Sequence, residues 1–138
     1  MRIMEAVAKR GIPLLVHTHS NSDFESPRHL AKVLSTFPEL PVIAAHTGGE
    51  DWLTASELIP LSDNVYFEFS CSCTTSDKLL YFLKEAGEDR LLFGSDANLF
   101  VPEYAMGFLE GLELPEPIFS KLMGLNAERL FHFPEGTE

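Results

Sequence analysis

The chain has 138 residues, 45% of them hydrophobic and 22% charged, a composition typical of a globular domain that excludes a disordered or fibrous chain. Its 10 basic and 21 acidic residues leave a formal net charge of -11, which disfavours nucleic acid and anionic membrane surfaces as partners. No apolar run approaches the roughly 18 residues that span a bilayer, and no signal-peptide core opens the chain. The two cysteines, Cys71 and Cys73, form no disulfide framework, so we expect a cytoplasmic protein.

Apolar runs alternate with segments of helical spacing along the chain. The predicted elements, in chain order, are a helix at 1–10, a strand at 13–17, a helix from Ser26 to near Pro38, a strand at 41–46, a helix at 49–60, a strand at 65–70, a helix from about 75 to 86, a strand at 91–96 and helices at 102–112, 115–123 and 126–131. Most of the strands are nearly continuous in apolar residues, which is typical of parallel strands covered on both faces. This order predicts an α/β fold with a parallel sheet, either open and doubly wound or part of a barrel.

Polar side chains with acid–base or metal-binding capacity follow three of the four predicted strands. His17 ends the first strand, His46 the second and Asp96 the fourth. Because the carboxyl ends of parallel strands meet at one edge of a sheet, we expect these side chains to share one site. One histidine at an apolar strand end is more often a core residue, but recurrence at three strands favours a common site. Imidazole nitrogens and carboxylate oxygens converging from separate elements are ligands that zinc prefers.

Two features beside His46 have a second interpretation. Gly48 and Gly49 precede a helix but lack the wider glycine pattern and the lysine of a phosphate-binding loop, so close backbone packing explains them as well. Trp52 begins that helix and is a candidate substrate contact, although an aromatic residue with this spacing is more often part of a core.

Three motifs occur in an order that resembles the amidohydrolase superfamily. They are Ala-His-Thr-Gly-Gly at 45–49, Asp-Arg-Leu-Leu-Phe-Gly-Ser-Asp at 89–96 and Asn-Ala-Glu-Arg-Leu-Phe at 126–131. The branch that they resemble is the amidohydrolase-related one, which includes aminocarboxymuconate-semialdehyde decarboxylase-like enzymes. The resemblance implies that residues 1–138 form a single partial domain, in which four parallel β/α units make the C-terminal half of a metal-dependent hydrolase (β/α)8 TIM barrel.

The resemblance also implies roles for the strand-end residues. His17 matches the metal ligand after the fifth barrel strand, His46 the histidine after the sixth and Asp96 the aspartate after the eighth. In the family that aspartate binds metal and exchanges a proton with the attacking water, while that histidine binds metal or polarises the substrate carbonyl. Asp96 and His46 are thus the expected catalytic residues. His17, His46 and Asp96 are the expected ligands of a divalent metal, zinc first and manganese second.

The chain departs from the family pattern where the first barrel strand should supply a His-x-His pair of metal ligands. His17-Thr18-His19 has that spelling, but one β/α unit separates it from the strand of His46, so we assign it to strand five and keep His19 as a candidate substrate contact. Without the missing pair we expect weak metal binding. A complete barrel needs about 250 residues, so the open edges of a half-barrel predict self-association or pairing with a missing barrel half.

The expected function is a metal-dependent hydrolase that acts on a small carbonyl- or carboxylate-bearing substrate through metal-activated water and an aspartate base. A decarboxylase of the same family is the first alternative. A catalytically incomplete half-barrel without bound metal is the second, and metal content discriminates it from an enzyme. A metal-dependent nuclease is disfavoured by the net charge of -11.

Overall fold

Four parallel strands form one sheet in the computed structural model, which describes residues 2–19, 21–70, 75–97 and 99–132. The strands are β1 (Leu14–His17), β2 (Val42–Ala45), β3 (Val65–Phe69) and β4 (Leu91–Phe93), and they lie in the order β1-β2-β3-β4. Strands that follow each other in the chain are therefore neighbours in the sheet, as they are in a β/α barrel. The two cysteines, Cys71 and Cys73, lie outside the described residues.

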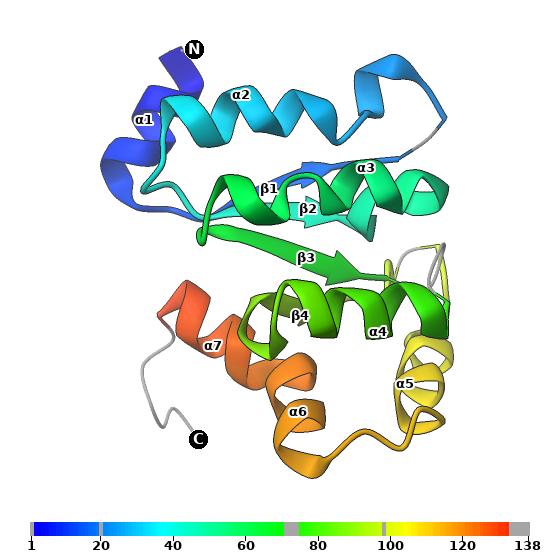
Figure 1. The fold of residues 1–138 in the computed structure, drawn as a ribbon. Helices are drawn as coiled ribbons and strands as arrows, with labels where there is room; N and C mark the ends of the chain where they lie inside the picture. The colour runs from blue at the N-terminus through cyan, green and yellow to red at the C-terminus, as the bar shows by residue number, and fades with distance from the viewer. Residues whose placement is uncertain (1, 20, 71–74, 98, 133–138) are drawn as a thin grey trace.

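Helices separate the strands and complete the chain (Figure 1). The α-helices are α1 (Arg2–Arg10), α2 (Arg28–Thr36), α3 (Trp52–Ser56), α4 (Ser76–Glu85), α5 (Pro102–Glu110), α6 (Glu116–Ser120) and α7 (Asn126–Phe131). Short 3-10 segments lie at Asp23–Glu25, His46–Asp51, Ile59–Leu61 and Glu88–Arg90, and a π-helical turn at Lys121–Leu125 joins α6 to α7. The predicted alternation of helices and parallel strands is confirmed.

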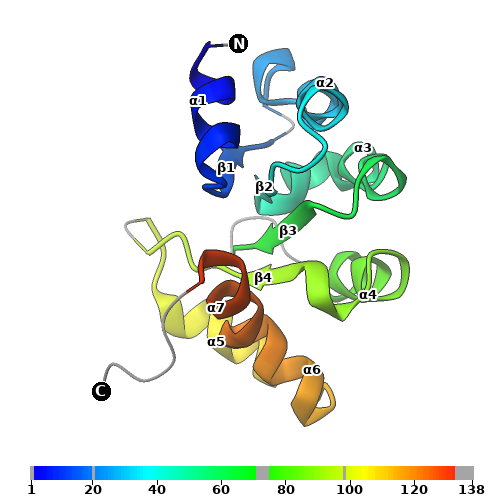
Figure 2. The same ribbon diagram turned by 90° about the vertical axis from the view of Figure 1, so that its left-hand side faces the viewer.

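The two faces of the sheet differ in their cover, because successive side chains of a strand point to opposite faces. Helices α2, α3 and α4 lie along one face (Figure 2), and the main hydrophobic core fills the space between them and the strands. The other face carries a smaller buried cluster of Ile43, Leu92 and Leu130. On this second face Leu15 of β1 is 60% exposed. The sheet thus has the covered outer side of a barrel and a partly open inner side.

One buried asparagine ties the C-terminal helix to the sheet. Nδ2 of Asn126 donates hydrogen bonds to the carbonyl oxygens of Glu88 at 2.7 Å and Leu91 at 2.8 Å, where β4 begins. One turn further along α7, Leu130 packs against the cluster on the inner side of the sheet. The motif at 126–131 therefore anchors α7 across the start of β4.

Several elements are shorter than the sequence pattern predicts, and left-handed backbone lies close to two of them. The predicted strand at 91–96 ends at Phe93, and Asp96, with a φ of 56°, has left the extended conformation. The predicted helix at 49–60 is α-helical only over Trp52–Ser56; residues 47–49 have positive φ values, and a 3-10 segment follows at Ile59–Leu61. None of the helices in the described part of the chain combines the length and apolar character needed to cross a bilayer.

Candidate active site

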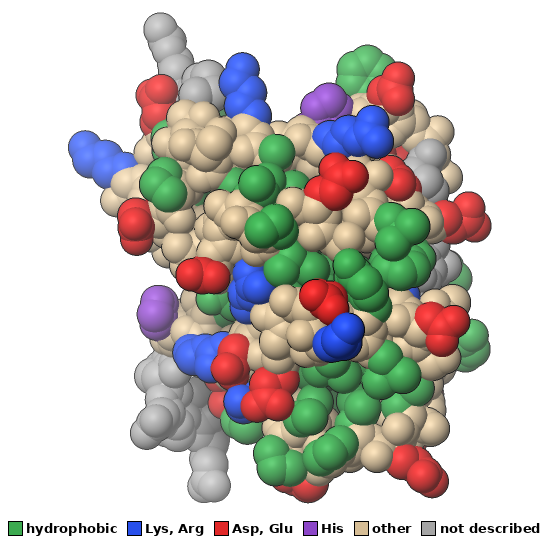
Figure 3. Space-filling model, in the orientation of Figure 1, with side chains coloured by type: hydrophobic (Ala, Val, Ile, Leu, Met, Phe, Trp, Pro, Cys, Tyr) green, Lys and Arg blue, Asp and Glu red, His purple; other side chains and the backbone are tan. Residues whose placement is uncertain are grey.

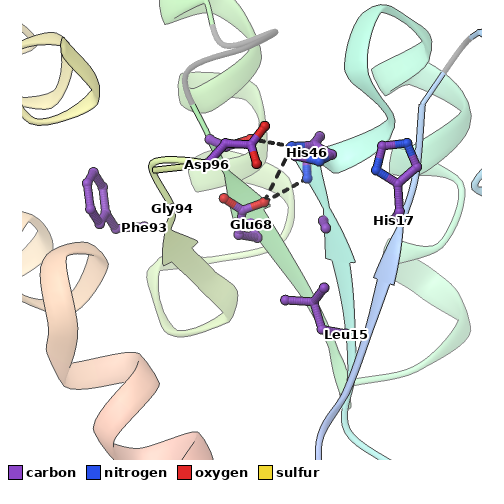
Figure 4. Close-up of a pocket in the computed structure, with 9 residues that line it drawn as sticks. Leu15, His17, His46, Glu68, Phe93, Gly94 and Asp96 are labelled. Atoms are coloured by element: carbon purple, nitrogen blue, oxygen red, sulfur yellow. Dashed lines mark hydrogen bonds and ion pairs between the residues drawn. The ribbon is translucent and has the colours of Figure 1, made fainter. Parts of the chain in front are cut away.

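A pocket of about 340 Å³ opens at the carboxyl ends of the strands (Figure 4). The residues that line it are Leu15, His17, Ala45, His46, Glu68, Ser70, Phe93, Gly94 and Asp96. The three strand-end residues that the sequence pattern predicts to share a site, His17, His46 and Asp96, all lie around this pocket. The structure adds Glu68 and Ser70 of the β3 region to them.

His46 follows β2 directly and has a left-handed backbone. Its φ is 61°, a conformation that costs a non-glycine residue about 1 kcal/mol or more. Its backbone N–H donates to Oε2 of Glu68 at 2.8 Å, and its ring nitrogen Nδ1 is hydrogen-bonded to Oγ of Ser70. The ring of His17 packs edge-on against the ring of His46, with the centroids 4.9 Å apart. Both the backbone and the ring of His46 are thus held at the pocket.

Two threonines fasten the turn that follows β2. Oγ1 of Thr18 donates to the carbonyl oxygen of Ala45 at 2.6 Å and accepts the backbone N–H of Gly48 at 2.9 Å. Oγ1 of Thr47 donates to the carbonyl oxygen of Glu68 at 2.7 Å. The turn is therefore bonded to the residue after β1 on one side and to β3 on the other.

The glycines of this turn are in close contact with neighbouring side chains. A Cβ atom on Gly48 would lie 3.0 Å from Cγ of Pro27, and one on Gly49 would lie 2.7 Å from Cδ2 of His19. Both glycines also have positive φ values, 75° and 60°. The close-packing interpretation of this glycine pair agrees with these distances.

His17 ends β1 at the side of the pocket. Its side chain is 54% exposed, and its Nε2 lies 3.7 Å from Oε2 of Glu25, so any ion pair between them forms only when the histidine is protonated. The ring of His19 stacks parallel to that of His17, with a centroid separation of 6.1 Å. Exposure to water weakens the His17–Glu25 interaction, which leaves His17 available to a ligand in the pocket.

Asp96 lies in the loop after β4 and projects into the pocket from the side opposite His17 (Figure 4). Its φ of 56° turns the chain sharply, and its carbonyl oxygen accepts the backbone N–H groups of Leu99 at 2.8 Å and Phe100 at 3.1 Å. The left-handed turn aims the carboxylate toward His46 instead of continuing the strand. His46 and Asp96 thus share an uncommon backbone conformation at the same edge of the sheet.

Glu68 is the ionisable residue of the pocket that the sequence pattern did not single out. It is the one charged residue of β3, Val65–Phe69, and its side chain faces the inner side of the sheet (Figure 4). Only 9% of Glu68 is exposed. A buried carboxyl group in an otherwise apolar strand is costly unless it is hydrogen-bonded, so the glutamate in this strand was the available signal.

Burial and neighbouring charges shift the pKa values of two groups at the pocket. The pKa of His46 is lowered, first by burial and then by the nearby His17. Burial raises the pKa of Glu68 to about 7, against the opposing effect of the hydrogen bond from the His46 backbone. Near neutral pH the imidazole of His46 is therefore mostly neutral, while the carboxyl group of Glu68 is partly protonated.

The raised pKa of Glu68 predicts a pH-dependent stability that Glu68→Gln should remove. In the unfolded chain this carboxyl loses its proton near 4.5, whereas the folded chain keeps it up to about 7, so the folded state binds more protons in between. The free energy of unfolding of the parent, relative to Glu68→Gln, should therefore fall by about 3 kcal/mol from pH 4.5 to pH 8.

Urea denaturation of both proteins across this pH range measures the difference. The lowered pKa of His46 acts in the opposite direction, adding stability as the pH rises toward 6.5; its largest cause, burial, is common to both proteins, so most of this contribution cancels in the comparison. A difference that stays constant with pH would show that Glu68 titrates normally.

The donor atoms at the pocket match a divalent metal in type but not in arrangement. Over the residues that the structure describes, no group of three or more His, Cys, Asp and Glu side chains gathers closely enough to hold a metal ion. Nδ1 of His46 is hydrogen-bonded to Ser70, and His17 lies beside Glu25. The set does not by itself fit an ion in this arrangement, and ligation by His17, His46 and Asp96 stays a prediction.

The two candidate substrate contacts lie off the pocket lining. The ring of Trp52 packs edge-on against Tyr81 and Phe82 of α4, with centroid distances of 5.2 and 6.4 Å. It therefore packs against the core between α3 and α4, as an aromatic residue with this spacing more often does, and a substrate contact by Trp52 stays a prediction. His19 lies behind His17, against Gly49, and is also not part of the pocket wall.

The arrangement of strands and site defines the class of protein as half of a TIM barrel with its site at the carboxyl ends of the strands. An uncharacterised TIM-barrel protein from Bordetella bronchiseptica is similar with a TM-score of 0.79 and 24% identity, over 95% of this chain and 49% of its own. A dihydroxybenzoic acid decarboxylase from Polaromonas sp. JS666, with bound manganese and the inhibitor 2-nitroresorcinol, has a TM-score of 0.73 and 18% identity, over 95% and 53%. A candidate 2-pyrone-4,6-dicarboxylic acid hydrolase from Pseudomonas putida has a TM-score of 0.74 and 19% identity, over 94% and 55%.

The sequence model of the amidohydrolase family matches residues 1–133, and the chain therefore belongs to this family. The chain spans about half the length of the solved structures that it resembles. A search of curated protein sequences finds no match. The family assignment that the three motifs suggest is thus confirmed.

Proposed function

We propose that the chain carries the C-terminal half of the active site of a metal-dependent hydrolase that acts on a small carbonyl- or carboxylate-bearing substrate. The observation that supports this most is the meeting of His17, His46 and Asp96, from the ends of three strands, around one pocket. In α/β barrels the reacting groups collect at this end of the strands. A pocket of about 340 Å³ suits a small molecule and not a polymer.

His46 and Asp96 have separate roles in the proposed proton transfers. His46, with its lowered pKa, is neutral at pH 7 and polarises the substrate carbonyl or accepts a proton. Asp96 faces it across the pocket and accepts the proton of the attacking water. We propose a divalent ion, zinc or manganese, as the cofactor, held by His17, His46 and Asp96 together with ligands from outside this chain. The bound manganese of the Polaromonas decarboxylase supports this choice.

Decarboxylation is the second candidate, and Glu68 is the observation that favours it. Loss of carbon dioxide leaves a carbon atom that must take up a proton. With a pKa of about 7, Glu68 holds a proton for part of the time at neutral pH and lines the same pocket. A general acid also protonates the leaving group in hydrolysis, so the reaction type is decided by whether carbon dioxide or a hydrolysed product forms.

We also propose that the half-barrel pairs with itself or with the missing barrel half. Strands β1 and β4 are the two edges of the sheet that the structure describes, and Leu15 on the inner side is 60% exposed. Nucleic acid and membrane surfaces are not proposed as partners. Acidic and basic side chains are interspersed on the face in Figure 3, and the net charge is -11.

Elemental analysis and turnover assays on the purified protein test the proposal, with its solution mass recorded in parallel. The parent is compared with an Asp96→Ala, His17→Ala double variant and with a control, Asp63→Ala, His29→Ala, whose two exposed positions lie outside the pocket. The probes are 2-pyrone-4,6-dicarboxylate for hydrolysis and 2,6-dihydroxybenzoate for release of carbon dioxide, the compounds for which a similar hydrolase and a similar decarboxylase of known structure are named.

In the protein paired with itself or with the missing barrel half, we expect about one metal ion per site in the parent and in the control, and its loss in the pocket variant with a decrease in turnover of at least about 100-fold. A metal-free parent that turns over neither probe would contradict the proposal. That result would favour a catalytically incomplete half-barrel.

A further inference from the structure

We propose that Glu68 and Lys78 are positioning residues that hold the backbone of His46 from both sides and so fix where its imidazole lies. The proposal rests on the proposed function only in taking His46 as a reacting group. The two residues belong to different elements, Glu68 to β3 and Lys78 to the first turn of α4.

The turn that carries His46 is intrinsically unfavourable. Four successive residues have positive φ values: His46 at 61°, Thr47 at 48°, Gly48 at 75° and Gly49 at 60°. The two non-glycine residues each cost about 1 kcal/mol or more in this conformation. Such a turn persists only where surrounding contacts determine it, so its anchors decide the position of the His46 side chain.

Lys78 provides the first anchor. Only 1% of Lys78 is exposed, and its Nζ donates to the carbonyl oxygen of His46 at 2.7 Å and to that of Gly49 at 3.3 Å. The same ammonium group lies 5.7 Å from the ring centroid of Phe69. Burying a lysine is costly unless its charge is hydrogen-bonded. Here the ammonium group of Lys78 donates to two carbonyl oxygens of the turn after β2.

Glu68 provides the second anchor, because its Oε2 accepts the backbone N–H of His46 at 2.8 Å. The two peptide groups on either side of the His46 Cα atom are therefore both bonded to buried side chains. Fixing both peptide planes fixes the φ and ψ of His46, and with them the direction of its Cα–Cβ bond. The hydrogen bond between the ring nitrogen Nδ1 and Oγ of Ser70 then sets the orientation of the imidazole.

Amide hydrogen exchange, measured by NMR on the full chain, tests this arrangement. Lys78→Met removes the ammonium group and keeps the length of the side chain, and Glu68→Ala removes the acceptor. Glu68→Gln keeps an oxygen that accepts the same N–H group. Lys84→Met is the matched control, because Lys84 lies on the same helix with its side chain 81% exposed. Exchange at His46 is divided by exchange at β2 amides, which removes any change in global stability.

In Lys78→Met and Glu68→Ala, we expect the normalised exchange of the His46 amide to rise about tenfold and the imidazole resonances of His46 to move. Glu68→Gln and Lys84→Met should keep the normalised exchange of the His46 amide within about threefold of the parent and leave its imidazole resonances in place. Unchanged exchange and unchanged imidazole resonances in both Lys78→Met and Glu68→Ala would overturn the proposal. Should those variants not fold, an unprotected His46 amide in the parent would overturn it equally.

These readouts do not depend on catalysis, so the two proposals fail separately. In a protein that turns over a probe, Lys78→Met should lower kcat about tenfold and leave KM nearly unchanged. The expected exchange pattern in a chain without metal or turnover would contradict the proposed function and leave the positioning role intact. Exchange that the two variants leave unaltered in an active enzyme would contradict the positioning role and leave the proposed function intact.

Discussion

Gly94→Ala is expected to destabilise the protein by about 2 kcal/mol and to displace Glu68 from its place beside His46. A Cβ atom on Gly94 would lie 1.6 Å from Oε1 of Glu68 and 2.5 Å from its Cδ, so the glutamate side chain must move. Glu68 is buried and accepts the N–H of His46, so its movement breaks a buried hydrogen bond. Urea denaturation measures the change in the free energy of unfolding.

Gly107→Ala is the control for this substitution. Gly107 lies within α5, and a Cβ atom there would meet no heavy atom of the described residues within 4 Å beyond its own helix backbone. Alanine at this position should therefore stabilise the helix by about 0.5–1 kcal/mol. The double variant Gly94→Ala, Glu68→Ala tests the cause. If the clash with Glu68 is responsible, the double variant costs less than the sum of the single ones, whereas additive costs would show that Gly94 is required for another reason.

Asn126→Asp is expected to cost about 3 kcal/mol or more. Asn126 is 1% exposed, and its Nδ2 donates to the carbonyl oxygens of Glu88 and Leu91. Aspartate has nearly the same shape but would place an acceptor oxygen and a negative charge against these two carbonyl oxygens. The anchor of α7 on the start of β4 would then be lost, and thermal unfolding should begin at a lower temperature.

Asn64→Asp is the matched control for that substitution. The Nδ2 of Asn64 also donates to a backbone carbonyl oxygen, that of Pro38 at 2.9 Å, but this bond lies near the surface. Water can replace it there, so the substitution should change the free energy of unfolding by no more than about 1 kcal/mol. Equal costs at Asn64 and Asn126 would contradict the role assigned to the buried anchor.

Both substitutions bear on the proposed active site. Gly94 and Asn126 adjoin the two ends of β4, the strand that precedes the Asp96 loop. The clash predicted at Gly94 reaches His46 through Glu68, so this glycine, Glu68 and Lys78 belong to one packed support beneath the reacting group. Accurate placement of reacting groups contributes strongly to catalysis. Substitutions that displace His46 are therefore expected to lower the proposed activity.

The sequence by itself determined the alternation of helices and parallel strands, the family, and the meeting of His17, His46 and Asp96 at one edge of the sheet. These follow from local patterns, because apolar periodicity sets the elements and parallel strands end at a common edge. The metal ligation and catalytic roles of the three residues stay predictions. The helical spacing around Trp52 favoured a core residue, and its ring packs against Tyr81 and Phe82.

Only the tertiary structure decided the support of the site. Glu68 and Lys78 bond the backbone of His46 from 22 and 32 residues away along the chain. Nothing in their local sequence specifies these contacts, since they depend on how β3 and α4 pack beside the turn after β2. The left-handed backbone of His46 and Asp96 is likewise a tertiary property, because it is uncommon even for Asp and His, which tolerate it better than most residues, and it persists where surrounding contacts stabilise it.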